Sequence, residues 1–308
     1  MDDQQSIERA AAALRAGGLV ILPTETVYGL AADASNAAAV AALYAAKGRP
    51  AFNPLIAHVA DLAMAQSIAR FDDRALVLAR RFWPGPLTLV LPIGDPAAVC
   101  DLARAGLDTV AVRAPAHPMA HAVLRAFGGP LVAPSANRSG RPSPTTFLDA
   151  IEETGEAAQG AVDGGPCRIG LESTVVALLD EARLLRPGAV VRGDIEALIG
   201  PLAEADADAG RSPGRLARHY APDLPVRLDV LAPLPREAFL AFGRAPSRDQ
   251  VWNLSPTGDL AEAAANLFAY LRAADRSGAS GIAVAPIPAE GLGEAINDRL
   301  RRAAGFVG

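Results

Sequence analysis

The strongest constraint on the fold is a short apolar run, residues 19–22, that ends at Pro23 and is followed at once by polar side chains. Four apolar residues suffice for one buried strand, and a proline ends it because proline cannot donate to a sheet ladder. Residues 24–28 then bring three hydroxyls and one carboxylate. Polar groups at the end of a buried strand are where α/β proteins place ligand contacts. The stretch favours such a site, although a plain polar turn would have the same composition.

A single lysine, Lys47, is the second informative feature. The chain has 29 lysines and arginines together, and Lys47 is the only lysine. Lysine is a compact point charge on a flexible stem and arginine is a planar fork, so a site that needs one cannot simply take the other. Gly48, Arg49 and Pro50 follow directly. These neighbours favour an anion site, although a lysine retained by chance would look the same.

Composition and charge disfavour several classes of protein. With 308 residues, 51% hydrophobic, the chain can bury a sizeable core, and its net charge of −5 argues against broad nucleic-acid binding. Cys100 and Cys167 lie outside any C-x-x-C pair, so neither a disulfide framework nor a zinc motif is expected. The N-terminus is polar, and no apolar run reaches the ~18 residues of a membrane span. We therefore expect a cytoplasmic protein with no membrane contact and at most a weak, local contact to RNA.

Strands alternate with helices along most of the chain, which predicts an α/β fold. The pattern over residues 1–200 suits one domain, with parallel and mixed sheets both open. Residues 201–222 are predicted to be a linker. A second α/β pattern occupies residues 223–308, with strands expected at 226–230, 250–254 and 281–287 and helices at 260–274 and 290–304.

Several common catalytic motifs are missing. The sequence has no G-x-x-x-x-G-K-[ST] loop, no G-x-G-x-x-G loop and no G-x-S-x-G elbow. His117 and His121 have the spacing of one helix face, but without a third ligand a helix-start histidine is the better interpretation, and we expect no protein-held metal. What remains is a set of short polar loops next to buried strands. Such loops suit a transfer to phosphorus that depends on positioning and charge stabilisation.

Taken together, these stretches resemble the threonylcarbamoyl-AMP synthase family, also called YrdC-like. The matching segments, in the family's order, are 23–30 (PTETVYGL), 47–50 (KGRP), 53–55 (NPL) with His58, 83–88 (WPGPLT), 112–113 (VR), 134–137 (PSAN), 139–140 (SG), 143–145 (SPT), 163–165 (DGG) and 170–175 (GLESTV). Residues 213–214 and 219–222, with the domain after them, look like the two-domain form of the family. The resemblance implies a twisted α/β domain with a large concave site, followed by a linker and a small Rossmann-like domain.

The resemblance also implies the reaction. L-Threonine and bicarbonate or carbon dioxide form a carbamate, and the carbamate oxygen attacks the α-phosphorus of ATP and expels pyrophosphate. The product, threonylcarbamoyl-AMP, supplies threonylcarbamoyladenosine formation on tRNA, and the transfer to tRNA belongs to partner transferase proteins. Magnesium would accompany ATP.

The resemblance assigns roles to particular residues. Lys47, Arg49 and magnesium would offset the charge of the departing pyrophosphate. The L-threonine contacts are assigned to Thr26, His58, Arg113, Ala133 and Ser173. The ATP contacts are assigned to Arg49, Asn53, Thr109, Ser135, Asn137, Ser143, Arg186 and Tyr220, with Tyr220 also reaching over the pocket as part of a lid.

Two other functions are compatible with parts of the sequence. A YrdC-like RNA-binding module would keep the fold and lose the synthase activity, and its RNA binding would weaken steeply with salt. A carbamoyl-transfer domain acting on a different acceptor is the second, but such domains usually carry zinc-type cysteine clusters, which this chain lacks.

Overall fold

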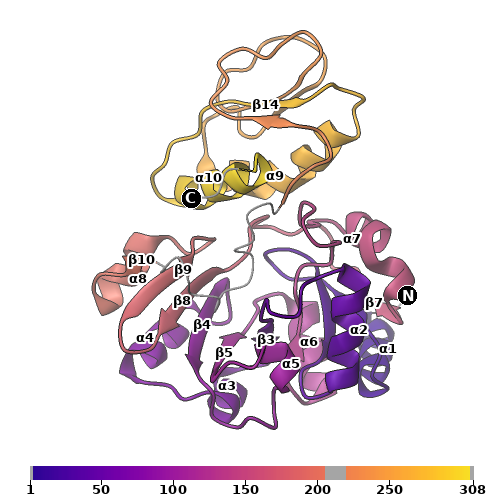
Figure 1. Ribbon diagram of the computed structural model, residues 1–308, viewed down its shortest axis with the longest axis vertical. Coiled ribbons are helices and arrows are strands. Elements are labelled where there is room, and N and C mark those ends of the chain that lie inside the picture. Colours follow the sequence, from indigo (N-terminus) through magenta and orange to yellow (C-terminus); the bar gives the residue numbers. More distant parts are fainter. Residues whose placement is uncertain (1–2, 205–219, 306–308) are drawn as a thin grey trace.

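The computed structural model describes residues 3–204, which we call the N-terminal domain, and residues 220–305, which we call the C-terminal domain (Figure 1). The N-terminal domain holds a ten-stranded sheet in the order β10-β9-β8-β4-β5-β3-β6-β2-β1-β7. Its strands are β1 (Val20–Leu22), β2 (Gly29–Asp33), β3 (Ile56–His58), β4 (Leu87–Pro92), β5 (Thr109–Arg113), β6 (Leu131–Val132), β7 (Gly160–Ala161), β8 (Thr174–Leu178), β9 (Ala182–Arg186) and β10 (Ala203–Glu204). Its helices are α1 (Asp3–Arg15), α2 (Ala37–Lys47), α3 (Leu62–Ile68), α4 (Asp73–Phe82), α5 (Asp101–Arg104), α6 (Pro118–Phe127), α7 (Phe147–Thr154), the 3-10 turn η1 (Gly155–Ala157) and α8 (Arg192–Ile199).

The α/β prediction is confirmed, and the sheet is mixed. Strands β3 and β5, and β4 and β8, pair in parallel, whereas β1–β2, β3–β6 and β4–β5 are antiparallel. Strand β2 was not predicted, because its sequence (GLAAD) lacks the β-branched residues that signal a strand. The polar segment 23–28 therefore joins two antiparallel neighbours, with Leu22 opposite Gly29.

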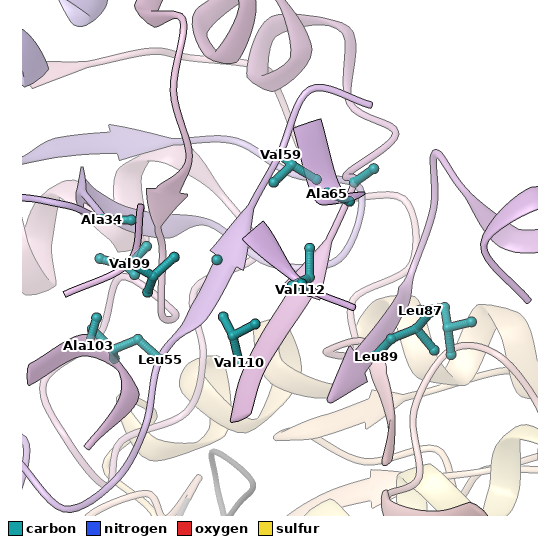
Figure 2. Close-up of a cluster of buried hydrophobic side chains, with 14 of the residues drawn as sticks. Ala34, Leu55, Val59, Ala65, Leu87, Leu89, Val99, Ala103, Val110 and Val112 are labelled. Atoms are coloured by element: carbon teal, nitrogen blue, oxygen red, sulfur yellow. The ribbon is translucent and has the colours of Figure 1, made fainter. Parts of the chain in front are cut away.

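The main core lies on one face of the sheet and fixes the central strands (Figure 2). Val110 and Val112 of β5 point into it together with Leu87 and Leu89 of β4. Burying each such side chain contributes roughly 1.5–3 kcal/mol. Because side chains alternate along a strand, Ala111 and Arg113 point to the opposite face. The core on one face of the sheet thus determines which side chains of β5 reach the opposite face.

The C-terminal domain has a four-stranded, all-parallel sheet in the order β11-β14-β12-β13. Its elements are β11 (Val226–Arg227), β12 (Ala238–Ala241), β13 (Val251–Asn253), α9 (Leu260–Asp275), β14 (Ile282–Val284) and α10 (Leu292–Ala303). The two helices lie between this sheet and the N-terminal domain (Figure 1). The three predicted strands are present but shorter, and the two predicted helices agree within two residues at each end. The inner strand β12 was not predicted.

The predicted domain boundary needs one correction. Ala203 and Glu204 form β10, which pairs in parallel with β9, so the first part of the segment predicted as a linker belongs to the large sheet. Most of the remaining predicted linker, residues 205–219, lies outside the described residues. No helix in the described ranges is long and apolar enough to cross a membrane.

Candidate functional site

A pocket lies on the face of the large sheet opposite the main core, and it encloses about 500 Å³ of unfilled space including its mouth. The pocket is lined by Thr26, Val27, Arg49, Leu55, Ile56, His58, Arg113, Ala133, Pro134, Ser135, Glu172, Ser173, Arg186 and Tyr220. The pocket lining therefore contains residues from distant parts of the N-terminal domain sequence and one residue of the C-terminal domain, Tyr220.

Strand alternation explains why three of the polar lining residues meet. His58 and Arg113 are direct partners in the parallel β3–β5 register. Ser173 immediately precedes β8 and has the same parity as Val175, which packs on the pocket face. The three side chains therefore project from the same face of the sheet.

Arg113 is held at the pocket floor by a buried ion pair. Its guanidinium donates to Glu25 Oε1 at 2.5 Å, to Thr26 Oγ1 at 2.9 Å and to the carbonyl of Gly85 at 3.1 Å. Burial alone would raise the pKa of Glu25, but Arg113 reverses this and holds that pKa below its usual value. Three of the five guanidinium N–H groups are used in this way, which leaves two for a ligand.

His58 is neutral and presents an acceptor. Its Nδ1 lies 3.1 Å from the carbonyl oxygen of Ile56, which can only accept, so the ring proton lies on Nδ1 and Nε2 carries a lone pair. Burial, followed by the nearby charge of Arg113, lowers the pKa of His58 to about 3. His58 therefore stays uncharged at neutral pH and can accept a hydrogen bond from a hydroxyl or an ammonium group.

Lys47 lies behind the pocket wall and holds the loop that follows β6. It is the last residue of α2, which Gly48 ends in the left-handed conformation at φ 57°. The Lys47 ammonium donates to the carbonyl of Ser135 at 2.5 Å and to the carbonyl of Asn137. Burial, with a smaller contribution from Arg49, lowers its pKa well below the usual value. Lys47 thus contacts a residue that lines the pocket, Ser135, without lining the pocket itself.

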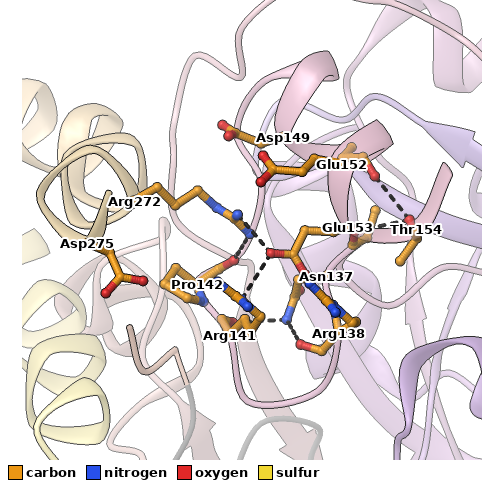
Figure 3. Close-up of polar contacts among 12 residues, drawn as sticks. Asn137, Arg138, Arg141, Pro142, Asp149, Glu152, Glu153, Thr154, Arg272 and Asp275 are labelled. Carbon is orange, nitrogen blue, oxygen red and sulfur yellow. Dashed lines mark hydrogen bonds and ion pairs between the residues drawn. The ribbon is translucent and has the colours of Figure 1, made fainter. Parts of the chain in front are cut away.

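Glu153 of α7 holds the other side of the same loop (Figure 3). Its carboxylate accepts from the backbone N–H of Arg138 at 3.0 Å and lies 3.2 Å from Arg141 Nε. Arg272 of α9 completes the group: it pairs with Glu153 at 2.9 Å and donates to the carbonyl of Pro142. The loop is therefore fixed by both domains.

Arg49, Arg186 and Ser173 form the basic side of the pocket. Arg186 donates to the carbonyl of Ser173 at 2.9 Å and approaches its hydroxyl at 3.3 Å, and that hydroxyl also lies 2.7 Å from Thr88 Oγ1. Arg49 is half-buried and donates to the carbonyls of Asn53 and Pro54. Burial lowers the pKa of Arg49 to about 10, so it is a cation at neutral pH.

Tyr220 closes the pocket from the side of the C-terminal domain. It is 1% exposed and has a φ of 61°, which is rare for a residue other than glycine. Its ring lies 5.4 Å from that of Phe268, and the Arg299 guanidinium lies 5.2 Å from its centre. Val27 of the N-terminal domain belongs to the same apolar cluster. Tyr220 is thus a packed part of the pocket wall.

The structure brings most of the predicted site residues together around this pocket, and the remaining five lie outside its lining. Lys47 and Asn137 meet at the loop after β6, and Ser143 donates to Glu172 Oε1 at 2.5 Å. Asn53 lies beside Arg49. Thr109 is at the start of β5, four residues from Arg113, and at about 3.3 Å per residue it lies at the far end of the strand.

The donor chemistry of the site does not form a metal cage. Among the described residues there is no group of three or more His, Cys, Asp or Glu side chains able to hold an ion. His117 caps α6, accepting from the N–H of Met119 at 3.2 Å, as its predicted helix-start position requires. Buried amide oxygens of Asn53 and Asn137 have no partner within the described structure, and an oxygen in that position can accept a hydrogen bond from a ligand.

Sequence reasoning missed four residues of this region: Glu25, Glu172, Arg272 and Arg299. The two arginines did leave a signal. In α10 the buried positions 295, 296, 299, 300 and 303 form one apolar stripe with an arginine inside it, and Arg272 similarly joins Phe268 and Leu271 on the buried face of α9. A charge inside an apolar stripe predicts a buried ionic partner.

Comparisons with known proteins agree over the whole chain. Residues 12–188 match the family described as telomere recombination, and residues 190–305 match the threonylcarbamoyl-AMP synthase C-terminal domain family. The chain is 41% identical to a Bacillus subtilis threonylcarbamoyl-AMP synthase, covering 97% of this chain and 93% of that protein. It is 40% identical to the Pyrococcus abyssi threonylcarbamoyl-AMP synthase, covering 99% and 95%. The fold matches a crystal structure of P. abyssi Sua5 complexed with L-threonine, with a TM-score of 0.91, 38% identity and coverage of 99% and 96%.

Proposed function

The chain belongs to the threonylcarbamoyl-AMP synthase family, and on that premise we propose how its pocket makes threonylcarbamoyl-AMP. L-Threonine and bicarbonate or carbon dioxide give a carbamate on the threonine nitrogen. A carbamate oxygen attacks the α-phosphorus of ATP, the bond to the β-phosphate breaks, and pyrophosphate leaves. The observation that carries this proposal is one pocket with a hydroxyl- and imidazole-lined floor beside a strongly basic wall.

L-Threonine binds at the floor formed by Thr26, His58 and Arg113. The two free N–H groups of Arg113 pair with the threonine carboxylate, because a guanidinium fork matches a carboxylate in geometry. The neutral Nε2 of His58 accepts from the ammonium or hydroxyl of threonine. Ala133 leaves room for the small side chain, since it lines the pocket with a methyl group.

ATP binds along the basic wall. Arg49 and Arg186 face the triphosphate, and Ser135 adds a hydroxyl at the same wall. Ser173, which is assigned to L-threonine, lines the same pocket. Lys47 acts from behind, through its charge and by holding the carbonyls of Ser135 and Asn137. Negative charge builds on pyrophosphate as it departs, and preorganised cations in a dry site stabilise such charge more strongly than water does.

Asn53, Asn137 and Ser143 belong to the same nucleotide side in this proposal. The unpartnered amide oxygens of the two asparagines are suited to donors on the nucleotide, such as an amino or a hydroxyl group. Ser143 acts through Glu172. Thr109 lies at the far end of β5, so its predicted ATP contact would require the nucleotide to extend beyond the pocket lining.

Magnesium, in this proposal, enters bound to the phosphates of ATP. Mg²⁺ prefers oxygen ligands and is commonly held by substrate phosphates together with one or two carboxylates. Glu172, the one carboxylate among the lining residues that the structure describes, is occupied by Arg299 and Ser143. When bound, the ion would neutralise phosphate charge. The described side chains supply hydroxyls rather than a protein cage.

The product is proposed to pass to tRNA-modifying threonylcarbamoyl transferase proteins. The buried ring of Tyr220 covers the pocket and would shield the labile intermediate from water until release.

The test is pyrophosphate release from ATP and Mg²⁺, with threonine and bicarbonate omitted in turn. We expect release only when both are present. Release that requires neither would contradict the synthase mechanism. The absence of any release, combined with RNA binding that weakens steeply with salt, would favour the RNA-binding module instead.

A further inference from the structure

Glu172 is an unusual residue for a wall that receives a triphosphate. Among the described residues that line the pocket it is the only carboxylate, it is 7% exposed, and it directly precedes Ser173. An uncompensated carboxylate beside bound phosphates would repel them strongly, because the interior screens charge far less than water. Something must therefore neutralise Glu172 if ATP is to bind there.

The compensating charge comes from the C-terminal domain. Arg299 of α10 is fully buried, and its Nε donates to Glu172 Oε2 at 2.8 Å. The other carboxylate oxygen accepts from the Ser143 hydroxyl at 2.5 Å. Burial alone would raise the pKa of Glu172, but Arg299 and, to a lesser extent, Arg186 hold it below its usual value. Glu172 is thus an anion, and its nearest cation belongs to the last helix described.

Arg299 has a second contact with the pocket wall. Its guanidinium lies 5.2 Å from the ring centre of Tyr220, within the range of a cation–π interaction. Its Nη1 pairs with the neighbouring Asp298 at 2.6 Å, which orients the fork. One side chain of the C-terminal domain therefore touches two lining residues, Glu172 and Tyr220, without lining the pocket itself.

We propose that Arg299 is a positioning residue for the nucleotide, and that the C-terminal domain completes the ATP site by cancelling the charge of Glu172. This inference rests on the proposed function, since it concerns the ATP end of the same pocket. It makes a specific statement about charge: ATP affinity depends on the balance between Glu172 and Arg299, whereas the threonine end, built on Arg113 and Glu25, has its own ion pair and is independent of that balance.

The experiment measures the affinity of the full chain for α,β-methylene-ATP with Mg²⁺ by calorimetry, because this analogue cannot release pyrophosphate. Arg299→Met should weaken binding by at least about tenfold, since it removes the ion-pair partner of Glu172 and leaves the weaker influence of Arg186 to offset that charge. Threonine KM should change less than about twofold. Arg301→Met, which removes an exposed arginine two positions along α10, is the matched control and should leave both values unchanged.

Two charge-balanced variants distinguish this role from simple packing. Glu172→Gln combined with Arg299→Met removes both charges, and Arg299→Lys keeps both, so each should bind the analogue within about threefold of the wild type. These two variants test the proposal even where Arg299→Met does not fold, with circular dichroism confirming that they are folded. A tenfold or greater loss in both folded, charge-balanced variants would overturn the proposal.

The outcomes separate the two proposals. A wild-type chain that does not bind the analogue contradicts the ATP part of the proposed function. A wild-type chain that binds it, together with an Arg299→Met variant that binds equally well, contradicts only the role of Arg299.

Discussion

At the domain interface, Arg272 and Arg299 lie 2.9 Å and 2.8 Å from the carboxylates of Glu153 and Glu172. At the pocket, Lys47 and Arg49 donate to main-chain carbonyl oxygens, and Arg49 also contacts the Tyr44 hydroxyl. Neither forms an ion pair with a carboxylate within the described residues. Both regions contain arginine or lysine side chains that are largely buried. The two regions differ in the groups that balance the positive charge: carboxylates at the interface and carbonyl oxygens at the pocket.

The difference indicates which cations stabilise the fold and which are reserved for a ligand. Burying a charge without an opposite charge is costly, and breaking a buried pair is strongly destabilising. The interface arginines are already paired, so they hold the two domains together. The pocket cations carry an electrostatic cost in the free protein, which an anionic substrate would relieve. This is the arrangement expected for an enzyme that binds a triphosphate.

The largest effect is expected at the interface, from Arg272→Met. The variant leaves the buried Glu153 with two partly exposed cations, Arg141 at 3.2 Å and Arg138 at 3.6 Å. We expect the free energy of unfolding to fall by about 3 kcal/mol. Urea-induced unfolding followed by circular dichroism measures it. A loss of unfolding free energy below about 1 kcal/mol would show that the buried interface pairs contribute little to holding the two domains together.

Next in size is Lys47→Met, which tests the pocket side. The substitution removes the buried charge and both hydrogen bonds to the loop after β6. We expect pyrophosphate release to fall at least about 100-fold, because a preorganised cation at departing phosphate is lost. Stability should fall less than in Arg272→Met, because the cost of burying this charge, which Glu153 offsets only in part, disappears with it. Arg80→Met, at an exposed position of α4, is the control. Near-normal turnover in Lys47→Met would remove Lys47 from the mechanism.

The sequence predicted the residues of the pocket better than the residues of the domain interface. Lys47 was identifiable as the only lysine in the chain, and the short motifs around it lie in loops whose residue types reflect ligand chemistry. The α/β class followed from the alternation of strands and helices, and α9, predicted over residues 260–274, begins at Leu260 and ends at Asp275. Strands β2 and β12 did not, because short alanine-rich strands are stabilised by their sheet neighbours rather than by their own propensity.

The interface could not be derived from local patterns. Arg272 pairs with a residue 119 positions away and Arg299 with one 127 positions away, and no local pattern specifies such partners. An arginine inside an apolar helix stripe indicates only that a partner exists. The placement of Thr109 outside the pocket lining likewise depends on the direction of β5, which the sequence did not supply.

A smaller effect concerns His58, which lies at the pocket but is neutral. Its pKa is about 3 in the folded protein and near 6.5 in the unfolded chain. The unfolded chain therefore binds a proton that the folded protein excludes as pH falls below about 6.5, so stability falls with pH. Between about pH 7.5 and about pH 6 the loss from His58 should be about 1 kcal/mol. His58→Asn cannot titrate and should lack this part of the pH dependence in urea unfolding. Identical pH dependence in both proteins would mean that His58 is not buried in its neutral form.

The smallest effect is expected from Arg276→Met, which removes the arginine directly after α9, four residues beyond Arg272. Arg276 also pairs across the interface, with Glu152 and Asp149 of α7, but half of its side chain is exposed. Water and salt screen exposed pairs, so we expect a loss below about 0.5 kcal/mol, and less at high salt. Both variants lose one positive charge, and Arg276→Met loses two cross-domain ion pairs where Arg272→Met loses one, so the number of pairs alone would predict the larger loss for Arg276→Met. If Arg276→Met destabilised the protein as much as Arg272→Met, the number of interface charges would matter rather than their burial. The difference between the interface and the pocket would then depend on how many charged groups each contains and not on how deeply they are buried.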